Sequence, residues 1–523
     1  MCGMSTELTH QPSTNDEFSF FDRMKLHAVM AVRAVNKASI ERWSSRTFRA
    51  HDYRDESLPA IVTAASHYSS SILPDILKVP AALPLHAKLK MSYVVPYYIL
   101  AGVLFRTFLK LPLSTEVRWS EFSDWNAWFP PHPEGWTDIH NDADFTAMRL
   151  QGPNPFLLQK GKEKGVFELD FGPAFDGVYA PVKATFQVIE DKLAPVNIRV
   201  GDDLFTPEDE GWARAKFIVN GLDARYTVFL RHLMHTHLIS GQAFSIASYA
   251  LANDHPFRPF VDFFTYGTLA VNDYAFKLLV TPASYFLQCG FLDGKDVGTL
   301  FDNFQALYTL DKLIPPKDIA ERGIDEIPNH PYAEDAPEIW AAISEVVAEH
   351  VDLTHHDDAS VRDDVRLQDW YAALLERLPD RTLESHPLDS IEAVVEILSA
   401  SVYLNVYHEV CGDFSPFVSA RTQEGKRLIN MANLRNPDLG PARAADVFLF
   451  DQGAWAGRFD NGGNFLMSMD LESQVSAVSL RKTLMALQDR LRALDHTLEA
   501  RNRRRRIPLL RLLPRRWKAS ISY

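Results

Sequence analysis

The stretch Arg231-His232-Leu233-Met234-His235-Thr236-His237, near the middle of the chain, places three histidines within six residues. Apolar residues surround it, and the pattern from Trp212 to Phe286 is helical, so the sequence predicts that the three histidines lie on a long helix. Neutral imidazole binds iron, zinc, copper and nickel, and the cluster therefore indicates a metal site. Hydrogen-bonded histidines with a structural role fit the same spacing, so both interpretations stay open.

Spacing distinguishes two candidate pairs of ligands. His232 and His235 are three residues apart and share one face of a regular α-helix. His232 and His237 are five residues apart and diverge by about 140° in a regular helix, but they approach one another across a π-bulge. Because π-bulges concentrate at functional sites, the second pair carries a geometric prediction that a structure can test.

His408 follows the almost wholly apolar segment Ile391–Tyr407. Such a segment predicts a helix in the middle of the protein. An imidazole there must hydrogen-bond or bind an ion, because an unsatisfied buried polar group is costly. A structural histidine and a metal ligand both fit. No HExxH motif, GxSxG elbow or phosphate-binding glycine loop occurs, which weakens the hydrolase and nucleotide-binding interpretations.

Length and composition indicate a globular protein. The 523 residues are long enough for a large core, and 46% of them are hydrophobic and 23% charged. A net charge of −14 argues against nucleic acid as the main partner. The three cysteines are too few for a disulfide framework, and residues 1–20 lack the features of a secretory signal. We therefore expect a cytoplasmic protein whose residues 1–20 are disordered.

Hydrophobic periodicity predicts a mainly α fold in one large domain, with a small antiparallel β sub-domain. The sequence indicates a long loop with short helices over residues 119–175 and two strands at residues 179–189 and 195–200. Helices are expected at residues 20–112, 212–286, 336–377, 388–411 and 471–506.

Several motifs, in order, resemble those of lipoxygenases over about residues 119–523. The motif of the segment entering the family's iron-binding helix is matched by Trp212-Ala-Arg-Ala-Lys216, Val219, Asp223 and His232-x4-His237. Further similar elements are Trp136-Thr-Asp138, Leu150-x-Gly152-Pro-Asn154-Pro155, Leu193-Ala-Pro195, Phe205-Thr-Pro207, His255-Pro256, Thr268-x3-Asn272, Asp364-x2-Leu-Gln368-x-Trp370, Arg501-Asn502 and Ala519-Ser-Ile-Ser-Tyr523. Residues 21–118 match less clearly, and no counterpart of the family's N-terminal β-barrel is expected, so the resemblance implies a catalytic domain over residues 21–523.

The resemblance implies a non-haem iron dioxygenase. It would insert O2 into polyunsaturated fatty acids that carry a cis,cis-1,4-pentadiene and give lipid hydroperoxides. The implied iron ligands are His232, His237, His408 and the α-carboxylate of the last residue, Tyr523. Manganese suits the same donor set.

Several residues depart from the family's pattern or stand next to its motifs. The position of a weak further ligand holds Gly412, and an arginine is replaced by Phe276. Gln242 stands beside Gly241, which replaces a glutamate. We add His235 and Gln368 as candidates for the pocket or for contact with the ligands.

These departures leave two alternatives to the dioxygenase. The same iron fold could run another oxidative reaction, as a hydroperoxide isomerase or an oxidase of a non-standard substrate. A metal-free lipid-binding relative is the other, although a chain with no metal has no need of all three histidines. Transient contact with a membrane surface could involve residues 74–112, and we expect the basic run Arg503–Arg506 to be a solvated helix end.

Overall fold

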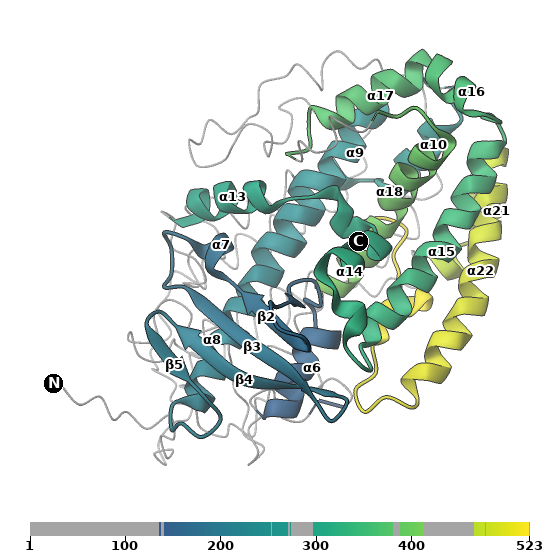
Figure 1. The fold of residues 1–523 in the computed structure, drawn as a ribbon. Coiled ribbons are helices and arrows are strands. Elements are labelled where there is room, and N and C mark those ends of the chain that lie inside the picture. The colour runs from purple at the N-terminus through teal and green to yellow at the C-terminus, as the bar shows by residue number, and fades with distance from the viewer. Residues whose placement is uncertain are drawn as a thin grey trace, which may run out of the picture.

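A computed structural model describes residues 135–136, 141–252, 254–269, 272, 296–379, 387–412, 465–475 and 477–521. This part of the chain is mainly helical, with one antiparallel sheet at one end (Figure 1). The predicted fold class is thereby confirmed. The expected disorder of residues 1–20, the helices of residues 20–112 and the domain boundary at residue 21 lie outside the described residues.

The sheet has five strands in chain order, each paired with the next: β1 (Gln159–Lys160), β2 (Val166–Asp170), β3 (Val182–Ile189), β4 (Lys192–Val200) and β5 (Asp203–Phe205). A two-residue turn joins β3 to β4, and both of its residues, Glu190 and Asp191, have positive φ, as type I′ hairpins require. The predicted hairpin is confirmed. The prediction of a long loop over residues 119–175 is wrong for β2. This segment is a strand with alternating burial, and it pairs with β3.

One long helical rod leads away from the sheet. It consists of α8 (Trp212–Arg225), the π-helix η3 (Tyr226–Gly241) and α9 (Gln242–Ala247), which follow one another without a break. In Figure 1, α8 lies by the sheet and α9 at the opposite end of the rod. A short 3-10 turn, η4 (Ser248–Ala250), and α10 (Phe257–Phe264) follow. The rod carries the histidine cluster through the protein interior.

Helix α18 (Ile391–Cys411) lies beside η3, as its apolar sequence predicts. It begins at Ser390, whose Oγ accepts a hydrogen bond from the backbone N–H of Ala393. On its other side it packs against α15 (Pro331–Asp352), which in turn packs against α22 (Val478–Asn502). The middle position of α18 brings His408 to the rod.

The remaining described helices and helical turns cover this centre: α6 (Asp142–Gln151), α7 (Gly172–Phe175), α13 (Asp296–Leu307), η5 (Leu310–Leu313), α14 (Pro315–Arg322), η6 (Ile324–Glu326), α16 (Asp358–Asp363), α17 (Val365–Leu375), η9 (Leu466–Ser468), α21 (Leu471–Gln474), η10 (Leu510–Leu512) and η11 (Pro514–Arg516). The single helix predicted over residues 336–377 is wrong, because α15 ends and two new helices begin. Each new helix has its own aspartate cap: Asp357 before α16 and Asp364 before α17.

The arginine run after α22 differs in part from the predicted solvated helix end. Arg503 and Arg504 are exposed, but Arg505 is mostly buried and its guanidinium bonds Asp335, whose side chain is fully buried in α15. Arg506 pairs with Asp144 of α6. The run therefore ties the end of the chain to α15 and α6. No helix among the described residues is long and apolar enough to cross a membrane.

Candidate metal centre

The backbone of η3 brings His232 and His237 together. In a π-helix each turn closes between residues five apart, so side chains at this spacing point the same way. The two ring centroids are 5.0 Å apart. The geometric prediction for the five-residue pair is confirmed, and the local helix type explains why a regular α-helix would have separated them.

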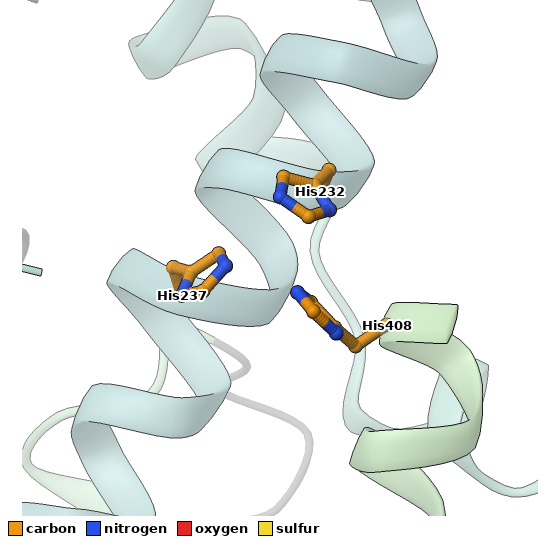
Figure 2. Close-up of side chains that lie close together, drawn as sticks. All are labelled: His232, His237 and His408. Carbon is orange, nitrogen blue, oxygen red and sulfur yellow. The ribbon is translucent and has the colours of Figure 1, made fainter. Parts of the chain in front are cut away.

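Helix α18 adds the third imidazole. The ring of His408 lies 4.7 Å from that of His232 and 5.1 Å from that of His237, between ring centroids. Figure 2 shows the three rings converging from two neighbouring helices. One ligand atom from each ring lies within 4.8 Å of the others. An ion held by bonds of about 2.1 Å would draw these atoms closer together than they lie here.

Asn272 sets the orientation and tautomer of His237. The Asn272 side-chain N–H donates to the backbone carbonyl of His237 at 2.6 Å, which leaves its Oδ1 to accept from His237 Nδ1 at 3.2 Å. A proton on Nδ1 leaves Nε2 with a free lone pair. Burial also lowers the pKa of His237 to about 4, so the ring is neutral at neutral pH. A neutral, oriented imidazole is what metal binding needs, and such outer contacts typically tune metal sites.

The C-terminal segment passes close to the cluster. Ser520 donates a hydrogen bond to the backbone carbonyl of Tyr266 at 2.6 Å. A Cβ on Gly241 would lie 2.3 Å from Cδ1 of Ile521, so the absence of a side chain on η3 lets this segment dock. Tyr523 itself, the predicted carboxylate ligand, lies outside the described residues. Its role stays a prediction, supported by the position of Ile521 two residues before it.

Two further predicted site residues lie by the cluster or on the rod. A Cβ on Gly412 would be 3.4 Å from Nδ1 of His232, so a side chain at this position would face the metal centre. Gln242 is buried in the first turn of α9, directly after η3. The other predicted position, Phe276, lies outside the described residues.

Gln368 and His235 are placed differently from the three converging rings. The Gln368 amide donates to the backbone carbonyls of Val361 and Leu388, at 3.0 and 2.8 Å, and so fastens α17 to its surroundings. His235 is buried on another side of η3, where its Nδ1 lies 3.4 Å from Arg231 Nη1. Burial, together with the charge of Arg231, holds the pKa of His235 well below its usual range.

Some contacts were missed by sequence reasoning. Asn272 was recognised only as part of a motif, and Tyr407 and Tyr308 were not predicted to lie near the site. The Tyr407 hydroxyl lies 3.5 Å from His235 Nδ1, and the Tyr308 ring is 4.8 Å from the His235 ring. The His-Pro and Asp-x-x-Leu-Gln motifs also meet, since His255 Nε2 lies 3.0 Å from Asp364 Oδ2. No local pattern signals these pairs, because they join distant segments.

Comparison with known proteins shows which family the chain resembles. The model of the family described as Lipoxygenase matches residues 203–408, which include all three converging histidines. Over this segment the chain is similar to lipoxygenases. It is 30% identical over 290 residues to the polyunsaturated fatty acid lipoxygenase ALOX15B of Rattus norvegicus, covering 53% of this chain and 42% of the relative. Linoleate 9/13-lipoxygenase of Pseudomonas aeruginosa is 24% identical over 430 residues, covering 72% and 61% respectively. The chain thus spans roughly half the length of these curated relatives.

Solved structures show the same fold. A lipoxygenase variant (delta413-417:GS LOX), crystallised anaerobically in complex with arachidonate, has a TM-score of 0.69 at 18% identity and covers 87% of this chain and 79% of that one. A calcium-dependent 11R-lipoxygenase has a TM-score of 0.65 at 17% identity, with coverage of 80% and 72%. The protein therefore has the lipoxygenase catalytic fold.

Proposed function

We propose that this chain is a non-haem iron dioxygenase of the lipoxygenase type. The observation that carries the proposal is the convergence of His232, His237 and His408 in the segment that matches the family. Three neutral nitrogen donors and one carboxylate oxygen form a mixed set that suits iron, and manganese as well. Iron, when bound, would supply the one-electron chemistry that lets O2 add to a fatty acid.

The chain's own residues hold the ligands and exclude water. Asn272 fixes the His237 ring, and η3 and α18 set the positions of the two segments that bear ligands. His237 and His408 are 6% and 8% exposed, so these two donors lie in a largely dry interior, while His232 is half-buried. We propose the Tyr523 carboxylate as the fourth ligand, brought close by the docked segment around Ser520 and Ile521.

The proposed substrates are a polyunsaturated fatty acid and O2. The names of the relatives support this class: one is a linoleate lipoxygenase, others are polyunsaturated fatty acid lipoxygenases, and one solved structure holds arachidonate. The largely apolar helix α18 lies beside η3, and an apolar lining suits an acyl chain.

Gly412 favours a second candidate within the same fold. A side chain at this position would lie against the His232 ring, and glycine supplies none. One potential ligand fewer changes the donor set of the ion. A hydroperoxide isomerase or an oxidase of another lipid is the activity that this difference supports.

The test uses iron-loaded protein with a free C-terminus, supplied with linoleate or arachidonate. We expect oxygen uptake together with conjugated-diene hydroperoxide, and neither in a His408→Ala variant. A protein that binds iron but forms no diene from either acid contradicts the dioxygenase. Consumption of added fatty acid hydroperoxide by that protein would then support the second candidate.

The fourth ligand has its own test. A short extension after Tyr523 displaces the terminal carboxylate and should abolish metal binding. The same peptide added at the N-terminus is the matched control and should leave metal content unchanged. Full metal content in the C-terminally extended protein contradicts the assignment.

A further inference from the structure

Beside the metal-facing side of η3, the same helix buries a guanidinium. Arg231 is 4% exposed and is surrounded by the rings of Phe156, Tyr226 and Phe304, whose centroids lie 5.8, 5.1 and 5.8 Å from its Cζ. Its Nη1 lies 3.4 Å from His235 Nδ1, its Nη2 lies 3.4 Å from the backbone carbonyl of Phe156, and its side chain also hydrogen-bonds Tyr407. None of these groups is a carboxylate, so none forms an ion pair with the arginine.

The carboxylates in this region are already paired with other cations. Asp223 lies 3.1 Å from Arg149 and also accepts a hydrogen bond from Asn154 at 2.7 Å. Asp318 accepts a hydrogen bond from Arg322 Nε at 3.1 Å and lies 2.9 Å from Lys312. Within the described part of the chain, no carboxylate lies within ion-pair distance of Arg231. Among the described residues, no ion pair therefore neutralises its positive charge, and Asp318 acts on it only from beyond ion-pair distance.

The effect of this charge reaches both helices that carry the histidines. On η3 Arg231 directly precedes His232, and its Nη1 lies 3.4 Å from His235 Nδ1. On α18 the hydroxyl of Tyr407 lies 3.5 Å from the same nitrogen of His235. Tyr407 directly precedes His408, and Cys411 contacts the backbone carbonyl of His408 through its thiol. The charge thus acts on groups adjacent to the metal centre.

We infer that Arg231 is a positioning residue that raises the reduction potential of the metal centre formed by His232, His237 and His408. The inference rests on the proposed function, because it needs a redox-active ion at these three rings. A fixed positive charge in a medium of low dielectric constant opposes the gain of positive charge when the ion is oxidised. Arginine suits this task because it does not lose its proton in proteins.

The experiment measures the midpoint potential of the iron-loaded full chain by a mediated redox titration, followed by electron paramagnetic resonance of the ferric state. Arg231→Gln removes the charge and keeps hydrogen-bond donors for His235 and Phe156. Arg231→Lys keeps the charge and is the matched control. We expect a lower potential than the parent in Arg231→Gln and the parent's potential in Arg231→Lys, with equal iron content in all three.

Two outcomes overturn the inference. One is a parental potential in Arg231→Gln with iron bound; the other is an equal fall in Arg231→Lys, which would show that charge is not the cause. If Arg231→Gln does not fold, Phe304→Glu places a carboxylate beside the unaltered arginine and should lower the potential likewise. An unchanged potential in that variant also contradicts the inference. A parent that binds no iron contradicts the proposed function instead.

Discussion

His237 and His235 lie on two sides of one π-helix and differ in their neighbours rather than in their burial. His237 and His235 are both buried, and burial lowers the pKa of each, so both rings are neutral. His237 faces two other imidazoles and is held from behind by Asn272. His235 faces a guanidinium, a tyrosine hydroxyl and aromatic rings instead.

The comparison separates two requirements of a metal ligand. Neutrality comes from burial and is met on both sides of η3. Among the described residues, convergent donors are present on one side only. A cation beside His235 would also lie against the positive charge of Arg231. A histidine-rich motif therefore shows that a metal site is feasible, and the neighbouring helix decides which histidines form it.

The largest expected effect is on metal affinity, and it should follow loss of a histidine of the metal centre but not loss of His235. His408→Ala should weaken metal binding by more than about 100-fold, beyond the loss typical of outer contacts. His235→Ala removes a ring of similar burial and should leave affinity near the parent value. Competition with a chelator, read as metal retained per chain, measures both. Equal losses in the two variants would remove the distinction between the two sides.

A smaller effect should follow from releasing the His237 ring. Asn272→Ala deletes the amide that accepts from Nδ1, and we expect about 10- to 100-fold weaker metal binding. Thr268→Val is the matched control, since its buried hydroxyl has no hydrogen-bond partner in the described part of the chain. The same chelator competition applies. Parental affinity in Asn272→Ala would show that packing alone holds the ring.

A third prediction tests burial as the source of neutral histidines, away from η3. Burial lowers the pKa of His350 to about 4, below its unfolded value of about 6.5. The unfolded chain therefore takes up a proton first as the pH falls, and stability is lost between about pH 6.5 and 4. Between pH 7 and 5 this loss should amount to about 1.8 kcal/mol of unfolding free energy.

Urea unfolding at the two pH values measures that loss in the parent and in His350→Gln. The variant should lose less stability on acidification, because glutamine takes up no proton. His356→Gln, at an exposed position, is the control and should behave as the parent does. An identical pH dependence in His350→Gln and the parent contradicts burial as the cause.

The smallest effect concerns the polar contacts around His235. Tyr308→Phe removes the hydrogen bond of 2.9 Å between the Tyr308 hydroxyl and Ser240 Oγ. We expect a loss of about 1 kcal/mol of unfolding free energy and no change in metal content. A double-mutant cycle with Ser240→Ala isolates the pair. Loss of metal in Tyr308→Phe would mean that the two sides of η3 are coupled.

Much of the fold could be predicted because periodicity is local. The apolar segment Ile391–Tyr407 predicted the central helix α18, and alternation predicted the hairpin of β3 and β4. Two local features were misread. Strand β2 is short and lies in a region rich in prolines and aromatic residues, and the break after α15 depends on aspartate caps within a helix-like pattern.

Only part of the site could be predicted, because some of its residues are close in sequence and others meet only in the folded chain. The five-residue spacing of His232 and His237 predicted that they would meet if the backbone formed a π-bulge, and the backbone there is a π-helix. The contacts of Asn272 and Arg231 could not be read from the sequence, because they depend on side chains that meet only in the folded chain. Tyr523 and Phe276 lie outside the described residues, so their predicted functions await a test.

The central claim is that one metal ion binds between His232, His237 and His408. The most direct test is an anomalous difference map, recorded at the iron absorption edge from crystals of iron-loaded protein with a free C-terminus. The account predicts a single strong peak between the three rings, absent in crystals of His408→Ala. No peak there after anaerobic iron loading, or a peak beside His235 instead, would contradict the account.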